Sequence, residues 1–497
     1  MTAHPNADVS LRVEGRAVEH NRPEGTTRER DGEIHVRPRR PTRPPRLAVR
    51  PGALASPRTP RVGGLVSGTS WTIAAVAAVT AGYGLGSRRL SRSPVSAAIV
   101  FVGFGVALGP LGLDLVSLDR DRGALLTLLE TALALVLFTD AMVVPVQELR
   151  SGGALPGRLL GIGLVLSIAV GWLLAWPLLP GLSVWELALV AAVLAPTDAA
   201  LSSGAISHPG VPPLVRQTLN VESGLNDGMV LPFFVLFLAA VPGTTYAEEG
   251  AAGTFWRALL LSTALGVAVG EIGGRLLCLS HRRGWITREW GQIYFLALAA
   301  GSYALALVTK GSGFIAAWVA GLALADALRR SGPSLPEAER RAELAEYLGS
   351  LLAMLSLLVF GAVLLGPALE HLSWRIVGYA LLSLTVVRMV PVAVALVGSG
   401  LKPPTVAYIA WFGPRGLASI VLGLLVAEEH VSGVQLIGRV VAVTVGLSVL
   451  LHGVSAVALS DRYARWYERA AGAAPGLRES AATPSPMRGR RLGAPDR

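Results

Sequence analysis

Charged residues and cysteine are both scarce in this chain of 497 residues. Only 15% of the residues are charged and 52% are hydrophobic, whereas roughly 25% are charged in an ordinary soluble protein. This composition argues against a soluble globular protein of the same length. Cys278 is the single cysteine, so an intrachain disulfide and a cysteine-based metal site are both impossible.

The positive charge is concentrated at the two ends of the chain. Residues 1–62 carry 13 Arg and 7 acidic residues, and residues 461–497 carry 8 Arg and 4 acidic residues. These segments hold +6 and +4 of the net charge of +11, so the apolar body between them is almost neutral. No nucleic-acid partner is expected, because a nucleic-acid-binding face is a basic patch on a folded domain.

The composition divides the chain into three parts. Residues 1–62 contain nine Pro and show little periodicity, which predicts a disordered basic tail. Residues 63–460 are predicted to form a transmembrane body, and residues 461–497 a short basic cytoplasmic tail.

Long apolar runs follow one another through the body. One helical crossing takes roughly 20 apolar residues, because a helix rises about 1.5 Å per residue and the hydrocarbon core is about 30 Å thick. The runs predict an all-α polytopic membrane protein with about thirteen transmembrane helices. The predicted spans are residues 66–86, 95–112, 123–144, 158–179, 184–203, 214–240, 255–279, 291–309, 311–330, 346–367, 375–398, 404–427 and 437–459.

Arginines in the short connections predict the orientation of the chain. If the spans alternate, the basic connections all fall on one side, which should be the cytoplasm. These connections contain Arg88, Arg89, Arg92, Arg150, Arg158, Arg216, Arg282, Arg283, Arg288, Arg329, Arg330, Arg340 and Arg341. Thirteen crossings of the plasma membrane then put the C-terminus in the cytoplasm and the N-terminus outside. The basic N-terminal segment opposes this, so either a long tail is translocated regardless of charge or the mature chain starts further along.

Ionisable side chains inside the predicted spans are candidates for function. Each costs about 2.5–3.5 kcal/mol at mid-membrane on insertion scales, and such residues generally mark ion pathways or sites. The candidates are Asp140, Asp198, Glu222, Asp227, Arg388 and Arg415.

The fifth predicted span contains Pro196, Thr197 and Asp198 near its middle. Pro196 removes a backbone hydrogen bond and clashes with the preceding turn, so it predicts a break in the helix. The freed carbonyls and the Thr197 hydroxyl become available as ligands. A packed proline kink would explain Pro196 alone, but a kink does not need the carboxylate of Asp198.

The sixth predicted span carries polar residues on two neighbouring helical faces. Glu222 and Asn226 are four residues apart, as are Ser223 and Asp227, so each pair shares a face. One face offers a hydroxyl and a carboxylate to an ion, and the other an amide and a carboxylate. This exceeds what helix packing in a membrane requires.

A second break is predicted in the twelfth span, where Gly413, Pro414 and Gly416 surround Arg415. Two proline-interrupted spans in matching positions are typical of inverted-repeat transporters whose site lies between broken helices. Half-helix ends carry partial charges, so Asp198 and Arg415 can each neutralise one kind of end.

Two further residues extend this candidate site. A lone intramembrane cation such as Arg388 needs an acidic partner, for which Glu222 is the candidate, and this pairing leaves Asp227 to titrate. Asp140 fits either a ligand or a cap at the end of a span.

At these residues the chain resembles the monovalent cation/proton antiporters of the CPA1 type, the family of the prokaryotic NhaP sodium/proton exchangers and of the animal NHE exchangers. The resemblance covers residues 66–460. It rests on Thr197-Asp198, Glu222-Ser-Gly-Leu-Asn-Asp227, Gly311-Ser-Gly-Phe-Ile-Ala-Ala-Trp-Val-Ala-Gly321, Arg388 and Gly413-Pro-Arg-Gly416.

The resemblance implies a thirteen-helix fold of inverted six-helix repeats with two broken crossing helices. It also implies a homodimer with a dimerisation domain and a moving core domain. By motif match, Asp227 would bind the ion or the proton. Asp198, Ser223 and the backbone carbonyl of Thr197 would help to coordinate the cation, and no cofactor is implied.

Other positions of the motifs organise this implied site. Asn226 would join the two broken helices, and Glu222 and Arg388 would form a structural ion pair. Asn226 next to Asp227, in place of two adjacent Asp residues, is similar to the electroneutral members. The chain departs from many members at Ala199, where they have proline after Thr-Asp.

The sequence therefore predicts a secondary transporter that exchanges Na⁺, or alternatively Li⁺ or K⁺, for protons, and not an enzyme. Two rival functions use some of the same residues. A passive cation channel would conduct without moving protons. An intramembrane aspartyl protease would need two carboxylates such as Asp198 and Asp227, but its Gly-x-Gly-Asp motif is absent because Asn226 occupies the second glycine position.

Overall fold

The structure is a computed structural model that describes residues 63–90, 95–116, 118–143, 155–248, 250–330, 343–429, 431–473 and 476–481. The chain divides into two units, Met1–Arg61 and Val62–Arg497. The first unit lies outside the described residues, so the disorder of the N-terminal tail stays a prediction.

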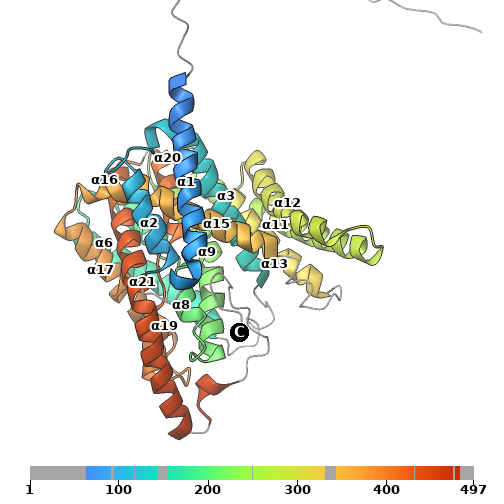
Figure 1. Ribbon diagram of the computed structural model, residues 1–497, viewed down its shortest axis with the longest axis vertical. Coiled ribbons are helices and arrows are strands. Elements are labelled where there is room, and N and C mark those ends of the chain that lie inside the picture. Colours follow the sequence, from blue (N-terminus) through green and yellow to red (C-terminus); the bar gives the residue numbers. More distant parts are fainter. Residues whose placement is uncertain are drawn as a thin grey trace, which may run out of the picture. The chain divides into compact units, whose positions relative to one another are not determined.

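All regular elements of the described residues are helices, as the apolar runs predict (Figure 1). Each predicted span coincides with one helix or with a row of consecutive helices. In chain order the elements are α1 (Gly63–Leu90), α2 (Ala97–Leu108), α3 (Leu118–Val143), α5 (Leu155–Arg158), η1 (Leu159–Gly163), α6 (Leu164–Leu178), α7 (Val184–Val193), α8 (Ser203–Ile206), α9 (Pro213–Ala240), α10 (Thr245–Glu248), α11 (Ala251–Arg282), α12 (Arg288–Val308), α13 (Gly313–Arg330), α15 (Glu343–Phe360), η2 (Gly361–Leu365), α16 (Gly366–Leu369), α17 (Trp374–Leu384), α18 (Val386–Ala395), α19 (Pro403–Trp411), α20 (Leu417–Glu428), α21 (Val434–Ala473) and η3 (Arg478–Ser480).

Length and composition suit these helices to a membrane. Within the described residues, eight helical segments are long and apolar enough to cross one. Three shorter apolar helices, α2, α7 and α20, accompany them, and α7 and α20 are the long arms of the two interrupted spans. This is the all-α polytopic membrane fold that the sequence predicts.

Other spans are interrupted less sharply. The π-helices η1 and η2 lie within the rows α5–η1–α6 and α15–η2–α16. Thr385 separates α17 from α18, and its φ of −109° and ψ of −85° are not helical. Pro391 inside α18 has no N–H to give to the carbonyl one turn earlier, which loosens the turn containing Arg388.

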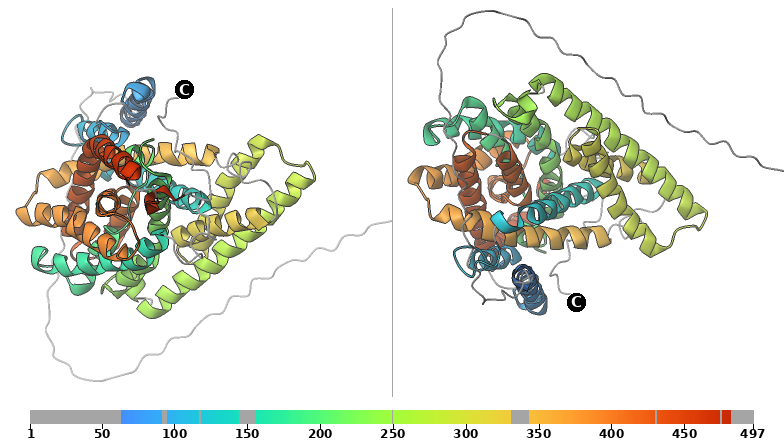
Figure 2. Two further views of the ribbon diagram at one scale, coloured as in Figure 1. Left: turned by 90° about the horizontal axis from the view of Figure 1, so that it is seen from below. Right: turned by 90° about the horizontal axis from the view of Figure 1, so that it is seen from above.

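The transmembrane helices gather in two groups that both views of Figure 2 separate. In one group, α11, α12 and α13 pack against one another. In the other, α6 packs against α7, α17 against α21, and α20 against α21. The helices α3 and α9 contact members of both groups, so residues on these two helices lie where the groups meet.

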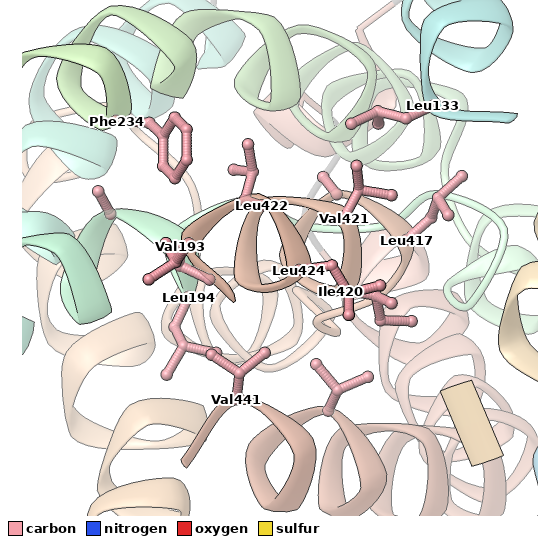
Figure 3. Close-up of a cluster of buried hydrophobic side chains, with 14 of the residues drawn as sticks. Leu133, Val193, Leu194, Phe234, Leu417, Ile420, Val421, Leu422, Leu424 and Val441 are labelled. Carbon is pink, nitrogen blue, oxygen red and sulfur yellow. The ribbon is translucent and has the colours of Figure 1, made fainter. Parts of the chain in front are cut away.

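The half-helix α20 runs through the centre of the second group (Figure 3). Side chains from four other helices surround it, and Ile420 and Leu422 are completely buried. The labelled neighbours are Leu133 of α3, Val193 of α7, Leu194 just after α7, Phe234 of α9 and Val441 of α21. This packing fixes the position of the break that precedes α20.

The last helix is longer than predicted. It continues to Ala473, past residue 459 where the thirteenth predicted span ends, and Tyr463 and Ala464 in this extension are buried. Residues 476–481 follow the helix, and Glu479 among them is fully buried. The start of the predicted C-terminal tail is therefore helical and packed.

Candidate functional site

The two broken spans meet at their breaks. Residues 194–202 separate α7 from α8, and residues 412–416 separate α19 from α20. The backbone N–H of Asp198 donates to the carbonyl of Pro414 over 2.8 Å, so the two segments are in direct contact. Both breaks occur at the prolines that predicted them, because proline cannot continue the hydrogen-bond ladder of a helix.

The carboxylate of Asp198 binds backbone N–H groups of the first break and of the start of α20. Oδ1 accepts from Ala200 at 2.7 Å and from Leu201 at 3.3 Å, and Oδ2 accepts from Leu417 at 3.1 Å. Leu417 is the first residue of α20, and the first N–H groups of a helix lack partners within the helix and carry partial positive charge. Asp198 therefore caps α20 from the other broken span.

The guanidinium of Arg415 does the reverse at the end of α7. Its Nη1 donates to the carbonyls of Ala195 at 2.6 Å and Pro196 at 3.1 Å. These carbonyls follow the C-terminus of α7, where the partial charge of the helix is negative. Arg415 is fully buried, so snorkelling to a membrane surface does not explain it.

Two glycines of the second break let the side chains of Asp198 and Arg388 approach the backbone. A Cβ on Gly416 would overlap Oδ2 of Asp198, and a Cβ on Gly413 would overlap Nε of Arg388. Any larger residue would push one of these side chains away. The Gly-Pro-Arg-Gly motif therefore combines a helix break with space for two charged side chains.

A buried polar network connects the first break to α9. Nδ2 of Asn226 donates to Oγ1 of Thr197 at 2.5 Å and to Oε1 of Glu222 at 3.2 Å. The hydroxyls of Thr197 and Ser223 are 3.1 Å apart and also share a hydrogen bond. Within the described part of the chain, Oδ1 of Asn226 has no hydrogen-bond partner. Asn226 thus binds the first break, but the expected link to the second break is not formed by its own side chain.

The expected partner of Arg388 is present. Nη1 and Nη2 of Arg388 donate to Oε1 and Oε2 of Glu222 at 2.8 and 2.9 Å. Both side chains are buried, and this two-point geometry is the strongest that a guanidinium and a carboxylate can adopt. The pair joins α18 to α9 and leaves Asp227, one residue after Asn226, outside the ion pair.

A pocket lies beside Asp227 where α3, α9, α15, α20 and the first break meet. It encloses about 410 Å³ of space between atoms, open solvent included. Its lining residues are Val136, Thr139, Asp140, Asp198, Ala199, Ala200, Asp227, Glu346, Gly349, Ser350, Ala353 and Leu417. Carboxylates from four segments therefore line one pocket, and Asp227 among them is only 7% exposed.

The pocket separates the predicted coordinating residues into two sets. Asp198 and Asp227 line it, whereas Thr197 and Ser223 are absent from its wall and bind each other and Asn226. Asp140 also lines it. A carboxylate close to the C-terminus of α3 would be repelled by the end of the helix, so the position of Asp140 favours a ligand over a cap.

Glu346 and Ser350 are pocket residues that the sequence did not single out. Glu346 stands at the first position of the tenth predicted span, where an acidic residue is ordinary at a membrane surface. Only the packing of α15 against α3 brings it to the pocket. The signal that could have found it is the one-turn spacing between the two polar residues, which puts both on one helical face.

The body of the chain matches a known protein family. Residues 75–461 match the family model described as sodium/hydrogen exchanger, transmembrane. The chain belongs to the sodium/hydrogen exchanger family. The resemblance to CPA1-type antiporters is thereby confirmed. The exchanger family consists of transporters, which agrees with the prediction that the protein is not an enzyme.

Individual relatives of this exchanger-family protein are distant. It is 25% identical over 350 residues to the K(+)/H(+) antiporter NhaP of Alkalimonas amylolytica, which covers 67% of this chain and 57% of that protein. It is 30% identical over 234 residues to the uncharacterized Na(+)/H(+) exchanger YjcE of Escherichia coli K12, covering 46% of this chain and 41% of that protein. The chain thus spans about half the length of these relatives.

A solved structure shares the fold. The sodium proton antiporter MjNhaP1 from Methanocaldococcus jannaschii at pH 8 superimposes with a TM-score of 0.65 at 19% sequence identity. The match covers 80% of this chain and 99% of that structure. At this identity the likeness concerns the fold of the exchanger body.

Proposed function

We propose that this protein exchanges a monovalent cation for protons across the plasma membrane by alternating access. The observation that carries the proposal is that Asp198 and Asp227 line one pocket at the contact of two broken helices. Family membership supports the same reaction class. Na⁺ is the proposed cation, with Li⁺ and K⁺ as alternatives.

Exchange requires that a proton and a cation compete for the same carboxylate. A buried carboxylate loses its hydration when it is charged, so a bound proton or a bound cation would each stabilise Asp227. Glu222 and Arg388 neutralise each other, which leaves Asp227 as the carboxylate of α9 that changes state. If the site rarely changes its exposure from one side of the membrane to the other while it is empty and charged, every cation that leaves must be replaced by a proton.

Oxygen donors around Asp227 suit an alkali cation. Asp198 and Asp227 supply carboxylate oxygens in the pocket, and Asp140 supplies a third within the same wall. Thr197 and Ser223 would contribute after a small shift, through the Thr197 carbonyl and the Ser223 hydroxyl. Because Asn226 takes the place of a second titratable carboxylate, one proton for one cation is the proposed stoichiometry.

The pocket is proposed to open toward the cytoplasm. Asp140 lies close to the C-terminus of α3 and Glu346 close to the N-terminus of α15. The chain outside these ends includes Arg150, Arg340 and Arg341, and basic connections favour the cytoplasmic side. The protein is proposed to be a homodimer. In this proposal α11, α12 and α13 belong to the dimerisation domain, and the group of helices around α20 is the core domain that moves against it.

Exchange in proteoliposomes tests the proposal. Purified protein is reconstituted with an internal pH dye, and Na⁺, Li⁺ and K⁺ are added in turn outside. We expect cation-dependent proton movement for the wild type and its loss in Asp227→Asn. Asp326→Asn is the matched control, because Asp326 pairs with Arg330 near the end of α13 and does not line the pocket. Cation current without proton movement would identify a channel and contradict the proposal.

A further inference from the structure

Two polar residues of α21 contact both ends of the second break. Ser448 and His452 are one helical turn apart, and both are buried. On one side of the break, Nε2 of His452 is 3.0 Å from the carbonyl oxygen of Trp411, the last residue of α19. On the other side, the backbone N–H of Arg415 donates to Oγ of Ser448 over 2.7 Å.

The two side chains also contact each other. Oγ of Ser448 lies 3.3 Å from Nδ1 of His452, and the Ser448 carbonyl oxygen lies 2.9 Å from the same nitrogen. Trp411 makes a second hydrogen bond to α21, because its indole N–H donates to Oγ of Ser455 at 3.0 Å. The rings of Trp411 and His452 are 5.1 Å apart.

One tautomer of His452 connects the two ends of the break through hydrogen bonds. A neutral imidazole has one N–H donor and one acceptor nitrogen, and the tautomer is assigned from the surrounding hydrogen bonds. With the proton on Nε2, the ring donates to Trp411, Nδ1 accepts from the Ser448 hydroxyl, and Ser448 accepts from Arg415. With the proton on Nδ1, the ring would instead donate to the Ser448 carbonyl at 2.9 Å, but a lone pair would face the Trp411 carbonyl and the two ends of the break would not be connected.

We infer that Ser448 and His452 are positioning residues for cation/proton exchange, forming a brace that fixes the distance between the two ends of the α19–α20 break. This inference rests on the proposed function. The series of hydrogen bonds runs from Trp411 through His452 and Ser448 to the backbone of Arg415. Arg415 in turn binds the carbonyls of Ala195 and Pro196. The brace therefore influences the position of Asp198 although Ser448 and His452 do not line the pocket.

The geometry gives this brace a role beyond general packing. The residue pair spans the irregular segment itself, where the helix supplies no hydrogen bonds of its own. Leu417, which binds the Asp198 carboxylate, follows Arg415 by two residues. A change in the length of the break would therefore move the N–H of Leu417, which binds the Asp198 carboxylate. This shift would change the affinity of the pocket for a cation.

Four variants in proteoliposomes test the brace through the apparent KM for Na⁺ and the maximal exchange rate. Ser448→Ala and His452→Leu each remove hydrogen bonds of the brace. His452→Gln keeps a donor near the position of Nε2. Thr444→Val is the control on the same helix, because its hydroxyl donates to the carbonyl of Val440 one turn earlier.

We expect Ser448→Ala and His452→Leu to raise the apparent KM by about 2- to 10-fold, the effect of one hydrogen bond, with a smaller change in maximal rate. His452→Gln should lie closer to the wild type than His452→Leu, and Thr444→Val should match the wild type. Ser448→Ala, a small change, keeps the test valid if His452→Leu does not fold.

Distinct results separate the two levels of the proposal. An inactive wild type would overturn the proposed function and this inference with it. An active wild type with unchanged KM in Ser448→Ala and in every folded His452 variant would overturn the brace alone. The brace is also overturned if folded His452→Gln is as impaired as folded His452→Leu.

Discussion

Asp198 and Arg415 each bind the backbone of the break that carries the other. The carboxylate of Asp198 accepts from the first N–H of α20, and the guanidinium of Arg415 donates to carbonyls just after α7. Each charge meets the end of a half-helix with the opposite partial charge. Unpaired backbone groups at these two helix ends would be costly inside a membrane, and the two reciprocal contacts give them partners. The same contacts hold the two broken spans together beside the pocket.

The close approach of Asp198 to Gly416 predicts a sensitive position. Gly416→Ala would put a Cβ against the Asp198 carboxylate. Overpacking of this kind costs about 1–3 kcal/mol, and here it also displaces a pocket carboxylate. We expect a lower thermal midpoint in detergent and loss of exchange. Gly438→Ala is the control, since a Cβ at Gly438 meets nothing within 4 Å, and equal behaviour of the two variants would disprove the constraint.

The buried pair of Glu222 and Arg388 predicts strong coupling. Removing one partner of a buried ion pair leaves an uncompensated charge and costs about 3–5 kcal/mol. Glu222→Gln and Arg388→Ala should therefore each lower stability strongly, and the double variant should be less damaged than their sum. Unfolding of all four proteins in the same detergent measures the coupling. Additive losses would mean that the two side chains do not interact.

Glu479 predicts that the segment after α21 stabilises the first half of the broken twelfth span. Its Oε1 accepts from the backbone N–H of Lys402 and from Oγ1 of Thr405, both at 2.8 Å, and no side chain of α19 itself caps that helix. Loss of a cap costs about 0.5–2 kcal/mol. Glu479→Ala should lower the thermal midpoint. The exposed Glu468 gives the control Glu468→Ala, and an equal midpoint in both variants would contradict the role of Glu479 as a cap.

The Asp140→Asn variant should change the affinity for the cation but keep exchange. Asp140 lines the pocket with Asp198 and Asp227, so Asp140→Asn removes one charged oxygen from the cation but leaves the proposed exchanging carboxylate. We expect the apparent KM for Na⁺ to rise roughly 10- to 100-fold, as for one interaction with a charged group. Asp326→Asn should not change it. An unchanged KM in Asp140→Asn would return Asp140 to a purely structural role.

The breaks were predictable because proline acts locally. Pro196 and Pro414 interrupt a helix through their own missing N–H and ring, so their effect does not depend on tertiary structure. The pair of Glu222 and Arg388 was predictable for a similar reason, since a buried cation in hydrocarbon must find an acid. Each prediction used a rule that leaves few partners to choose from.

Other parts of the site depend on how distant helices pack. The sequence suggested that Asp198 and Arg415 neutralise helix ends, but which end each one binds follows from how the spans cross. Glu346 lies at the end of a predicted span, where an acidic residue is ordinary, and the packing of α15 against α3 brings it to the pocket. His452 lies within an apolar run, and the packing of α21 brings it to the second break. Glu479 lies in a segment whose basic composition predicted a tail, and its carboxylate binds Lys402 and Thr405 at the start of α19.

The dependence of the apparent KM for Na⁺ on pH tests the central claim most directly. If a proton and a cation compete for Asp227, the KM in proteoliposomes should rise by about tenfold for each unit that the pH falls on the acid side, as one-proton linkage requires. The maximal rate should stay constant at saturating Na⁺. A KM that does not change with pH, or a maximal rate that falls while the KM stays fixed, would contradict competition at a single carboxylate.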